Sequence, residues 1–215
     1  MNRFDAVLFD LDGTLLYTLP DIHAAVNAAL AIHGYGANTL HQSREYVGHG
    51  SRWLIECSLP AGTDPEEVTR VLATYRACYA EHLMDRTEPY PGIEGMLSAL
   101  KARGVRMGVA TNKFHENAVL MMEHFFGGTI EVTQGNIAGR PPKPAPDTAL
   151  AVMEALGAAP ERTLLVGDSD VDALTARNTG ISCVLCAWGY RERRELESFE
   201  SLAVIDTPAQ LPDYI

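Results

Sequence analysis

The sequence predicts an α/β fold: a Rossmann-like, three-layer core around a parallel sheet, with a small α-helical cap domain inserted after the first strand. Short apolar segments, often β-branched, recur along the chain, and patterns with helical spacing separate most of them. This alternation favours a mainly parallel sheet that helices cover on both faces. One long stretch, residues 16–88, has helical patterns but no convincing strand. We therefore expect that stretch to form a separate helical unit.

The short apolar segments predict the strands of the core, and proline and glycine residues mark the ends of two of its helices. A helix that begins near Ile93 is expected to end at Gly104, and another begins near Pro146 and ends at Gly157. Proline suits the first turn of a helix, and glycine commonly follows the last. The expected strands cover residues 4–11, 106–112, 129–134, 163–169 and 182–188.

Two helices are expected in the inserted unit. Residues 20–34 carry apolar side chains on one face, and residues 64–83 begin with Asp64 and Glu67 at the spacing of a capping box. The chain then returns to the sheet through the sequence EPYPG. The predicted division is a core of residues 1–15 and 89–215 and a cap of residues 16–88.

The composition is that of a globular protein. Of the 215 residues, 47% are hydrophobic and 21% are charged, and the net charge is −11. This charge argues against nucleic acid or an anionic membrane as the main partner, although a local cation would still allow an anionic substrate. The start of the sequence lacks the pattern of a secretory signal, and no apolar run is long enough to span a bilayer. We expect a cytoplasmic protein.

Cys183 and Cys186 form a C-x-x-C pair, which is also found in redox and zinc sites. They lie, however, in a segment with the pattern of a buried strand. Positions three apart in a strand point to opposite faces, so the two sulfur atoms are expected to diverge. We interpret both as free thiols in the core.

Polar residues interrupt the apolar pattern where several strands end. Asp10 and Asp12 follow the first, Thr111 and Asn112 end the second, and the segment GDSDVD, residues 167–172, ends the fourth. Lys143 stands among four prolines between the third and the fourth. Taken singly, each group suits a turn, a helix cap or a solvated side chain. Ligands of parallel sheets bind beyond the carboxyl ends of the strands, so together these groups predict one site.

The pair Asp10 and Asp12 needs a compensating interaction. Two neighbouring carboxylates repel each other and lose hydration when buried. A bound cation, phosphoryl chemistry, or a simple turn with a helix cap would each explain the pair.

With the motifs DLDGT, TN, KP and GDSDVD in this order, the chain resembles the haloacid dehalogenase superfamily of phosphohydrolases. The resemblance covers nearly all of the sequence, including the helical insertion, which is similar to the cap of that superfamily. The segments TLPDIHAAVNAAL, YVGHGSRWLIE, YPGIEGMLSALKARG and KPAPDTAL are further similar to bacterial phosphoglycolate phosphatases.

The resemblance implies a role for each acid of the first motif. Asp10 would be the nucleophile that forms an aspartyl-phosphate. Asp12 would protonate the leaving alkoxide and then activate water. Superfamily members that release halide lack an acid at this position, because halide leaves without a proton. Mg²⁺ would be bound by Asp10, Asp168 and the backbone carbonyl of Asp12.

The remaining motifs would hold the phosphoryl group. The Thr111 hydroxyl, the Asn112 backbone amide and Lys143 would contact its oxygens. Asp172 would orient Lys143 or a metal-bound water, whereas Asp170 is additional and expected to face solvent.

In the cap, the segment VGHGSRW is expected to face the site, with His49 and Arg52 as candidates to bind a substrate carboxylate. The alternative is an ordinary helix start, with a solvated Arg52. Trp53 is expected to pack in the cap. Tyr17 lies on the expected hinge, where relatives commonly carry an acid.

We therefore expect a Mg²⁺-dependent phosphatase of small metabolites, with 2-phosphoglycolate as the first candidate substrate. Within the same superfamily, a pyrophosphatase, a sugar-phosphate phosphatase or a phosphomutase are alternatives. A receiver domain or a non-catalytic phosphate-binding module are alternatives from other classes. The sequence predicts a small phosphorylated partner, no nucleic acid and no membrane, and it indicates no oligomeric state.

Overall fold

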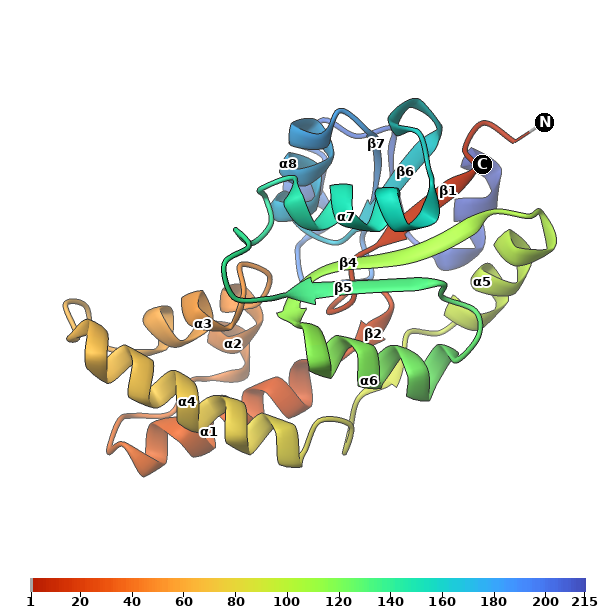
Figure 1. The fold of residues 1–215 in the computed structure, drawn as a ribbon. Coiled ribbons are helices and arrows are strands. Elements are labelled where there is room, and N and C mark those ends of the chain that lie inside the picture. The colour runs from red at the N-terminus through yellow and green to blue at the C-terminus, as the bar shows by residue number, and fades with distance from the viewer. Residues whose placement is uncertain (1) are drawn as a thin grey trace.

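The structure, a computed structural model, describes residues 2–215 and is built around one six-stranded sheet (Figure 1). The strands lie in the order β5-β4-β1-β6-β7-β8, and every pairing is parallel. This confirms the predicted α/β fold. The strands are β1 (Ala6–Phe9), β4 (Arg106–Phe114), β5 (Val132–Asn136), β6 (Thr163–Gly167), β7 (Ser182–Cys186) and β8 (Ala203–Ile205).

Helices cover both faces of this sheet (Figure 1). Successive residues of β1 enter different cores: Val7 packs in the cluster that contains Met121 of α6 (His115–Phe126), whereas Leu8 packs with Val152 of α7 (Asp147–Leu156). Successive side chains of a strand point to opposite faces, so one short strand supplies both layers. The core helices are α5 (Ile93–Ala102), α6 (His115–Phe126), α7 (Asp147–Leu156), α8 (Asp170–Thr179) and α9 (Arg193–Leu196), with short 3-10 helices at Pro160–Arg162 and Pro208–Tyr214.

The cysteine pair of β7 behaves as predicted. Cys183 belongs to the cluster on the α7 face and Cys186 to the cluster on the opposite face. Both are free and buried. The C-x-x-C spacing therefore reflects the packing of a strand.

Four helices form the inserted unit: α1 (Leu19–Ile32), α2 (Leu40–Tyr46), α3 (Ser51–Ser58) and α4 (Pro65–Glu81). The longest two, α1 and α4, pack against each other through their apolar faces, of which that of α1 was predicted from the sequence. The predicted capping box is only half formed. Asp64 accepts a hydrogen bond from the Glu66 amide at 2.7 Å, but Glu67 binds Arg70 and His33 instead.

A small antiparallel sheet of β2 (Leu16–Tyr17) and β3 (Glu88–Pro89) joins the two parts. No strand was expected in residues 16–88, because two-residue strands show no alternation of apolar and polar side chains that could identify them. The predicted boundaries between core and cap fall at this sheet, and they remain a prediction. The ring of Tyr17 lies 5.8 Å from that of Tyr90 and 6.5 Å from that of Tyr190, which packs the hinge onto the core.

No helix among residues 2–215 is long and apolar enough to cross a lipid bilayer.

Candidate active site

Three buried carboxylates meet at the carboxyl edge of the sheet. Asp10 follows β1, Asp168 follows β6, and Asp172 lies in the first turn of α8; each offers one oxygen within 4.8 Å of the others. Lys143 Nζ lies 2.7 Å from Asp172 Oδ1 and 3.1 Å from Asp10 Oδ1. The resemblance implied that Asp172 orients Lys143 or a metal-bound water, and in the structure its carboxylate contacts Lys143.

Glycines allow this close approach. Gly13 has φ +85°, and a Cβ there would lie 2.3 Å from Asp168 Oδ2. A Cβ at Gly167 would lie 2.1 Å from Asp172 Cγ, well inside van der Waals contact. The glycines of the DxDGT and GDS motifs are therefore required by the acids beside them.

The electrostatics of the cluster call for a cation. Burial raises the pKa of Asp10 to about 6, against the opposing charge of Lys143, and burial together with Asp172 and Asp10 raises the pKa of Asp168 well above its usual value. Burial alone would lower the pKa of Lys143, but Asp10 and Asp172 together raise it. The one ammonium is shared by two of the three acids.

The donor set fits Mg²⁺, a hard cation that prefers one or two carboxylates with water and substrate oxygens. Among residues 2–215, Asp10 Oδ1 accepts no well-oriented hydrogen bond although it is buried. Asp168 points to the same place and accepts a hydrogen bond from the Tyr190 amide at 2.7 Å. Asp172 is already bound to Lys143 and to the Ser169 hydroxyl. Asp10 and Asp168 are thus the carboxylates best placed to hold a metal ion.

Asn112 connects three segments through its side chain. Its amide nitrogen donates to the Gly48 carbonyl and to the Lys143 carbonyl, both at 3.0 Å, and its Oδ1 accepts from the Lys143 amide at 2.7 Å. Thr111, also buried, accepts a hydrogen bond from the Lys113 amide at 3.2 Å. Asn112 therefore fixes the lysine loop against β4 and contacts the cap.

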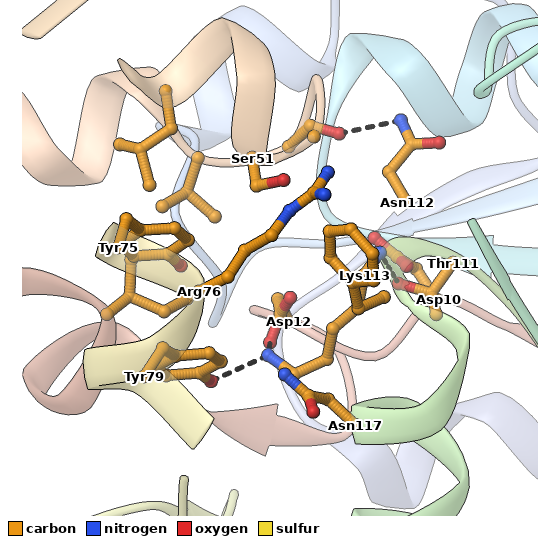
Figure 2. Close-up of a pocket in the computed structure, with 16 residues that line it drawn as sticks. Asp10, Asp12, Ser51, Tyr75, Arg76, Tyr79, Thr111, Asn112, Lys113 and Asn117 are labelled. Carbon is orange, nitrogen blue, oxygen red and sulfur yellow. Dashed lines mark hydrogen bonds and ion pairs between the residues drawn. The ribbon is translucent and has the colours of Figure 1, made fainter. Parts of the chain in front are cut away.

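Asp12 is bound to Lys113, a lysine that was not among the predicted site residues. Lys113 Nζ lies 2.8 Å from Asp12 Oδ1 and donates to Tyr79 Oη of α4 at 2.7 Å (Figure 2). The strand expected at 106–112 continues to Phe114, with a register shift against β5, so Lys113 belongs to the strand. The sequence did contain a pattern that could have identified Lys113: it lies two positions after Thr111, and residues two apart lie on the same face of an extended chain.

The pocket at this edge lies between core and cap, is open to solvent on one side, and has a volume of about 50 Å³. The core side includes Asp10, Asp12, Thr111 and Lys113, and the cap side includes Tyr75, Arg76 and Tyr79. Figure 2 shows the side chain of Arg76 extending from α4 toward Ser51. The pocket is thus narrow and holds charges of both signs.

The comparisons with known proteins agree with this arrangement. Residues 7–186 match the model of the haloacid dehalogenase-like hydrolases. The chain belongs to this family. Phosphoglycolate phosphatase 1 of Pseudomonas aeruginosa is 36% identical over 207 residues, which cover 93% of this chain and 75% of the relative. The phosphoglycolate phosphatase of Rhodospirillum rubrum is 34% identical over 220 residues, covering 98% of this chain and 90% of the relative.

Solved structures of the family share the whole fold. One is a protein of Lactobacillus delbrueckii subsp. bulgaricus that has been provisionally named a phosphoglycolate phosphatase. It superposes with a TM-score of 0.92 at 27% identity, covering 98% of both chains. A haloacid dehalogenase-like hydrolase of Streptococcus pneumoniae has a TM-score of 0.90 at 22% identity, covering 100% of this chain and 99% of the other. The predicted resemblance to this family and to phosphoglycolate phosphatases is confirmed.

Within this hydrolase, the cap segment after α2 faces the pocket, but through residues other than those expected. Gly48, Gly50 and Ser51 line it. Arg52 is exposed and bound to Glu56 at 2.9 Å, while His49 lies 3.7 Å from Asp170 and borders a separate surface cleft. A role for these two residues in substrate binding remains an untested prediction.

Two further expectations for neighbouring residues need correction. Trp53 does not pack in the cap: it is 47% exposed, because α3 turns its other face inward. Asp170 does not simply face solvent: its carboxylate lies 3.7 Å from His49 and 4.0 Å from Arg191.

Proposed function

We propose that this hydrolase is a Mg²⁺-dependent phosphatase that cleaves small phosphomonoesters through an aspartyl-phosphate at Asp10. The observation that carries the proposal is the buried group of Asp10, Asp168 and Lys143, with Asp10 and a second acid, Asp12, both lining the pocket between core and cap. The named activity of the relatives supports it. Phosphoryl transfer depends mainly on positioning and charge stabilisation, which this arrangement supplies.

In the first step, a carboxylate oxygen of Asp10 attacks phosphorus as the bond to the ester oxygen breaks. Asp12 gives its proton to the departing alkoxide, so a neutral alcohol leaves. In the second step, Asp12 takes a proton from water, which attacks the phosphorus of the aspartyl-phosphate. Phosphate leaves and Asp10 is regenerated. Positioned acid–base groups of this kind typically contribute about 10²–10⁴-fold.

The phosphoryl oxygens would be held by the Thr111 hydroxyl, the Asn112 amide and Lys143. Lys143 is well suited, because its ammonium is buried and fixed between Asp10 and Asp172. When bound by Asp10, Asp168 and the Asp12 carbonyl, Mg²⁺ supplies positive charge that offsets the repulsion between the carboxylates and the substrate.

We further propose 2-phosphoglycolate as the substrate, with Arg76 binding its carboxylate. Of the cationic side chains that line the pocket in residues 2–215, Lys113 is bound to Asp12, whereas Arg76 has no carboxylate within salt-bridge distance. Its guanidinium lies over the Phe114 ring at 3.8 Å. Arg76 is an exposed residue, so an anionic ligand can reach it; partial burial and the nearby Arg52 lower its pKa, and an anionic ligand would oppose that shift. A narrow pocket also favours a short substrate.

Phosphate release from a substrate panel tests the proposal. The panel holds 2-phosphoglycolate, pyrophosphate, sugar phosphates and nucleotides, each with Mg²⁺ or with a chelator, and Asp10→Asn is the blank. Mg²⁺-dependent release that the variant lacks, fastest with 2-phosphoglycolate, is the expected result. A different preferred compound would overturn the substrate alone, and no release from any compound would overturn the phosphatase.

A further inference from the structure

We propose that Lys113 is a positioning residue for Asp12, and that Tyr79 of the cap holds Lys113 in place. The inference rests on the proposed function, because it concerns the acid–base step. It assigns the alignment of that step to one contact chain that runs from the cap helix α4 through Lys113 to the core.

Lys113 is a buried ammonium with two partners. Its side chain is 4% exposed, and Nζ contacts Asp12 Oδ1 at 2.8 Å and Tyr79 Oη at 2.7 Å. Nζ also lies 4.6 Å from the centre of the Tyr79 ring. Burying a charge is costly unless it is paired and hydrogen-bonded, so these contacts fix where the ammonium can lie.

The contacts to Asp12 are made on one side of its carboxylate. Thr18 Oγ1 donates to Asp12 Oδ1 at 2.7 Å, and Lys113 donates to the same oxygen. Among residues 2–215, no protein group donates a hydrogen bond to Oδ2. One oxygen is therefore anchored, and the other is left to exchange a proton with the ester oxygen or with water.

Tyr79 connects this arrangement to the cap. It lies in α4, is buried, and stacks on Tyr75 with ring centres 5.7 Å apart and planes 7° apart (Figure 2). Such a fixed ring holds its hydroxyl at a defined place over β4. Because α4 belongs to the cap, Lys113 has its second partner only while the cap lies against the core. Cap closure thereby aligns Asp12.

Two other roles of Lys113 would give different kinetics. If Lys113 only contributed to folding, or bound the phosphoryl group directly, its loss would slow all phosphate esters alike. A positioning role in proton donation predicts a loss that grows as the leaving group becomes more basic, because a basic alkoxide needs the proton most.

The experiment compares kcat/KM for aryl phosphates of similar size, from p-nitrophenyl to phenyl phosphate, and for ethyl phosphate. This ratio reports the steps up to release of the alcohol, and none of the substrates carries a carboxylate that could bind elsewhere. Lys113→Met is compared with Lys113→Arg, which keeps the charge, and with Tyr79→Phe, which keeps the ring. Lys101→Met, at an exposed lysine, is the control.

We expect Lys113→Met to lose about 10²-fold or more on ethyl phosphate, within the range of acid–base catalysis, and far less on p-nitrophenyl phosphate. Lys113→Arg should recover part of this loss, and Tyr79→Phe should show a smaller loss with the same dependence on leaving group. In an Asp12→Asn background, Lys113→Met should not steepen the dependence further.

An equal loss on every substrate in Lys113→Met and no leaving-group effect in Tyr79→Phe would overturn the inference. If Lys113→Met does not fold, as judged by circular dichroism, Tyr79→Phe alone decides. A wild-type enzyme that releases no phosphate from any ester would instead overturn the proposed function.

Discussion

The two buried lysines of the site, Lys143 and Lys113, differ in where their partners come from. Lys143 contacts Asp10 and Asp172, both on the core sheet or the helix that follows it. Lys113 contacts Asp12 of the core and Tyr79 of the cap. The half of the site around Lys143 is therefore complete within the core, whereas the half around Lys113 needs the cap. In the proposed mechanism, the core half would hold the phosphoryl group and the half that needs the cap would transfer the proton.

The largest expected effect comes from breaking the core half with Lys143→Met. The substitution leaves Asp10 and Asp172 buried without a cation, and removing one partner of a buried ion pair typically costs about 3–5 kcal/mol. Urea unfolding without Mg²⁺ measures the change in the free energy of unfolding. Lys113→Met should cost less, because the Asp12 side chain is 14% exposed and keeps Thr18, whereas that of Asp172 is fully buried. The reverse order would contradict the comparison.

A second test disturbs the core half without changing a charge. Gly13→Ala would place a Cβ 2.3 Å from Asp168 Oδ2 at a backbone conformation that alanine rarely adopts. We expect weaker Mg²⁺ binding, by about 10–100-fold, as for changes behind other metal ligands. Titration of activity with Mg²⁺ measures it, and Gly95→Ala, at an open helix position, is the control. If Gly13→Ala required the same Mg²⁺ concentration as the wild type, Asp168 would not be a metal ligand.

Arg76→Met tests the cap half through the substrate. Loss of a charge-assisted contact of about 1.5–3 kcal/mol should raise KM for 2-phosphoglycolate by at least about 10-fold. KM for ethyl phosphate, which has no carboxylate, should stay the same. Arg52→Met serves as the matched control, because Arg52 is exposed and paired with Glu56. Were Arg52→Met the more damaging variant, the substrate carboxylate would be bound by the residue predicted from the sequence.

The smallest effect is expected from Arg191, a core residue that forms a second set of contacts with the cap. Arg191, in the loop after β7, donates to the carbonyls of Arg44 at 3.2 Å, Glu45 at 3.3 Å and Val47 at 3.0 Å. Arg191→Met should increase amide hydrogen exchange in residues 40–50 and leave the exchange of β1 and β6 unchanged, because the lost hydrogen bonds all go to carbonyls of the cap. Equal protection of residues 40–50 in both proteins would mean that Arg191 does not restrain the cap.

The division into a core half around Lys143 and a half around Lys113 that needs the cap also explains which site residues the sequence could predict. Asp10 and Asp168 stand directly after apolar strands, and Lys143 stands in a proline-rich loop, so local patterns identify them. Thr18 and Tyr190 are 172 positions apart, yet their hydroxyl groups lie 3.0 Å from each other, and no local pattern reports that contact.

The cap residues were missed for a different reason. Tyr79 belongs to the buried apolar face of its helix, where its position in the sequence indicates only packing within the cap, whereas Arg76 lies off that face. Which turn of α4 meets the site depends on how the cap packs on the core, and this is decided by contacts distant in sequence. Strands β2, β3 and β8 escaped prediction because two or three residues show no periodicity.

The central claim is that Asp10 carries the phosphoryl group, and trapping that intermediate tests it most directly. 2-Phosphoglycolate with a radioactive phosphoryl group is mixed with the enzyme and Mg²⁺, and the reaction is quenched in acid within the first turnover. The labelled peptide is then identified by mass spectrometry. The account predicts a hydroxylamine-sensitive label on Asp10 that forms and decays as fast as turnover and is absent in Asp10→Asn. Turnover with no label on Asp10, or with the label on another residue, would contradict it.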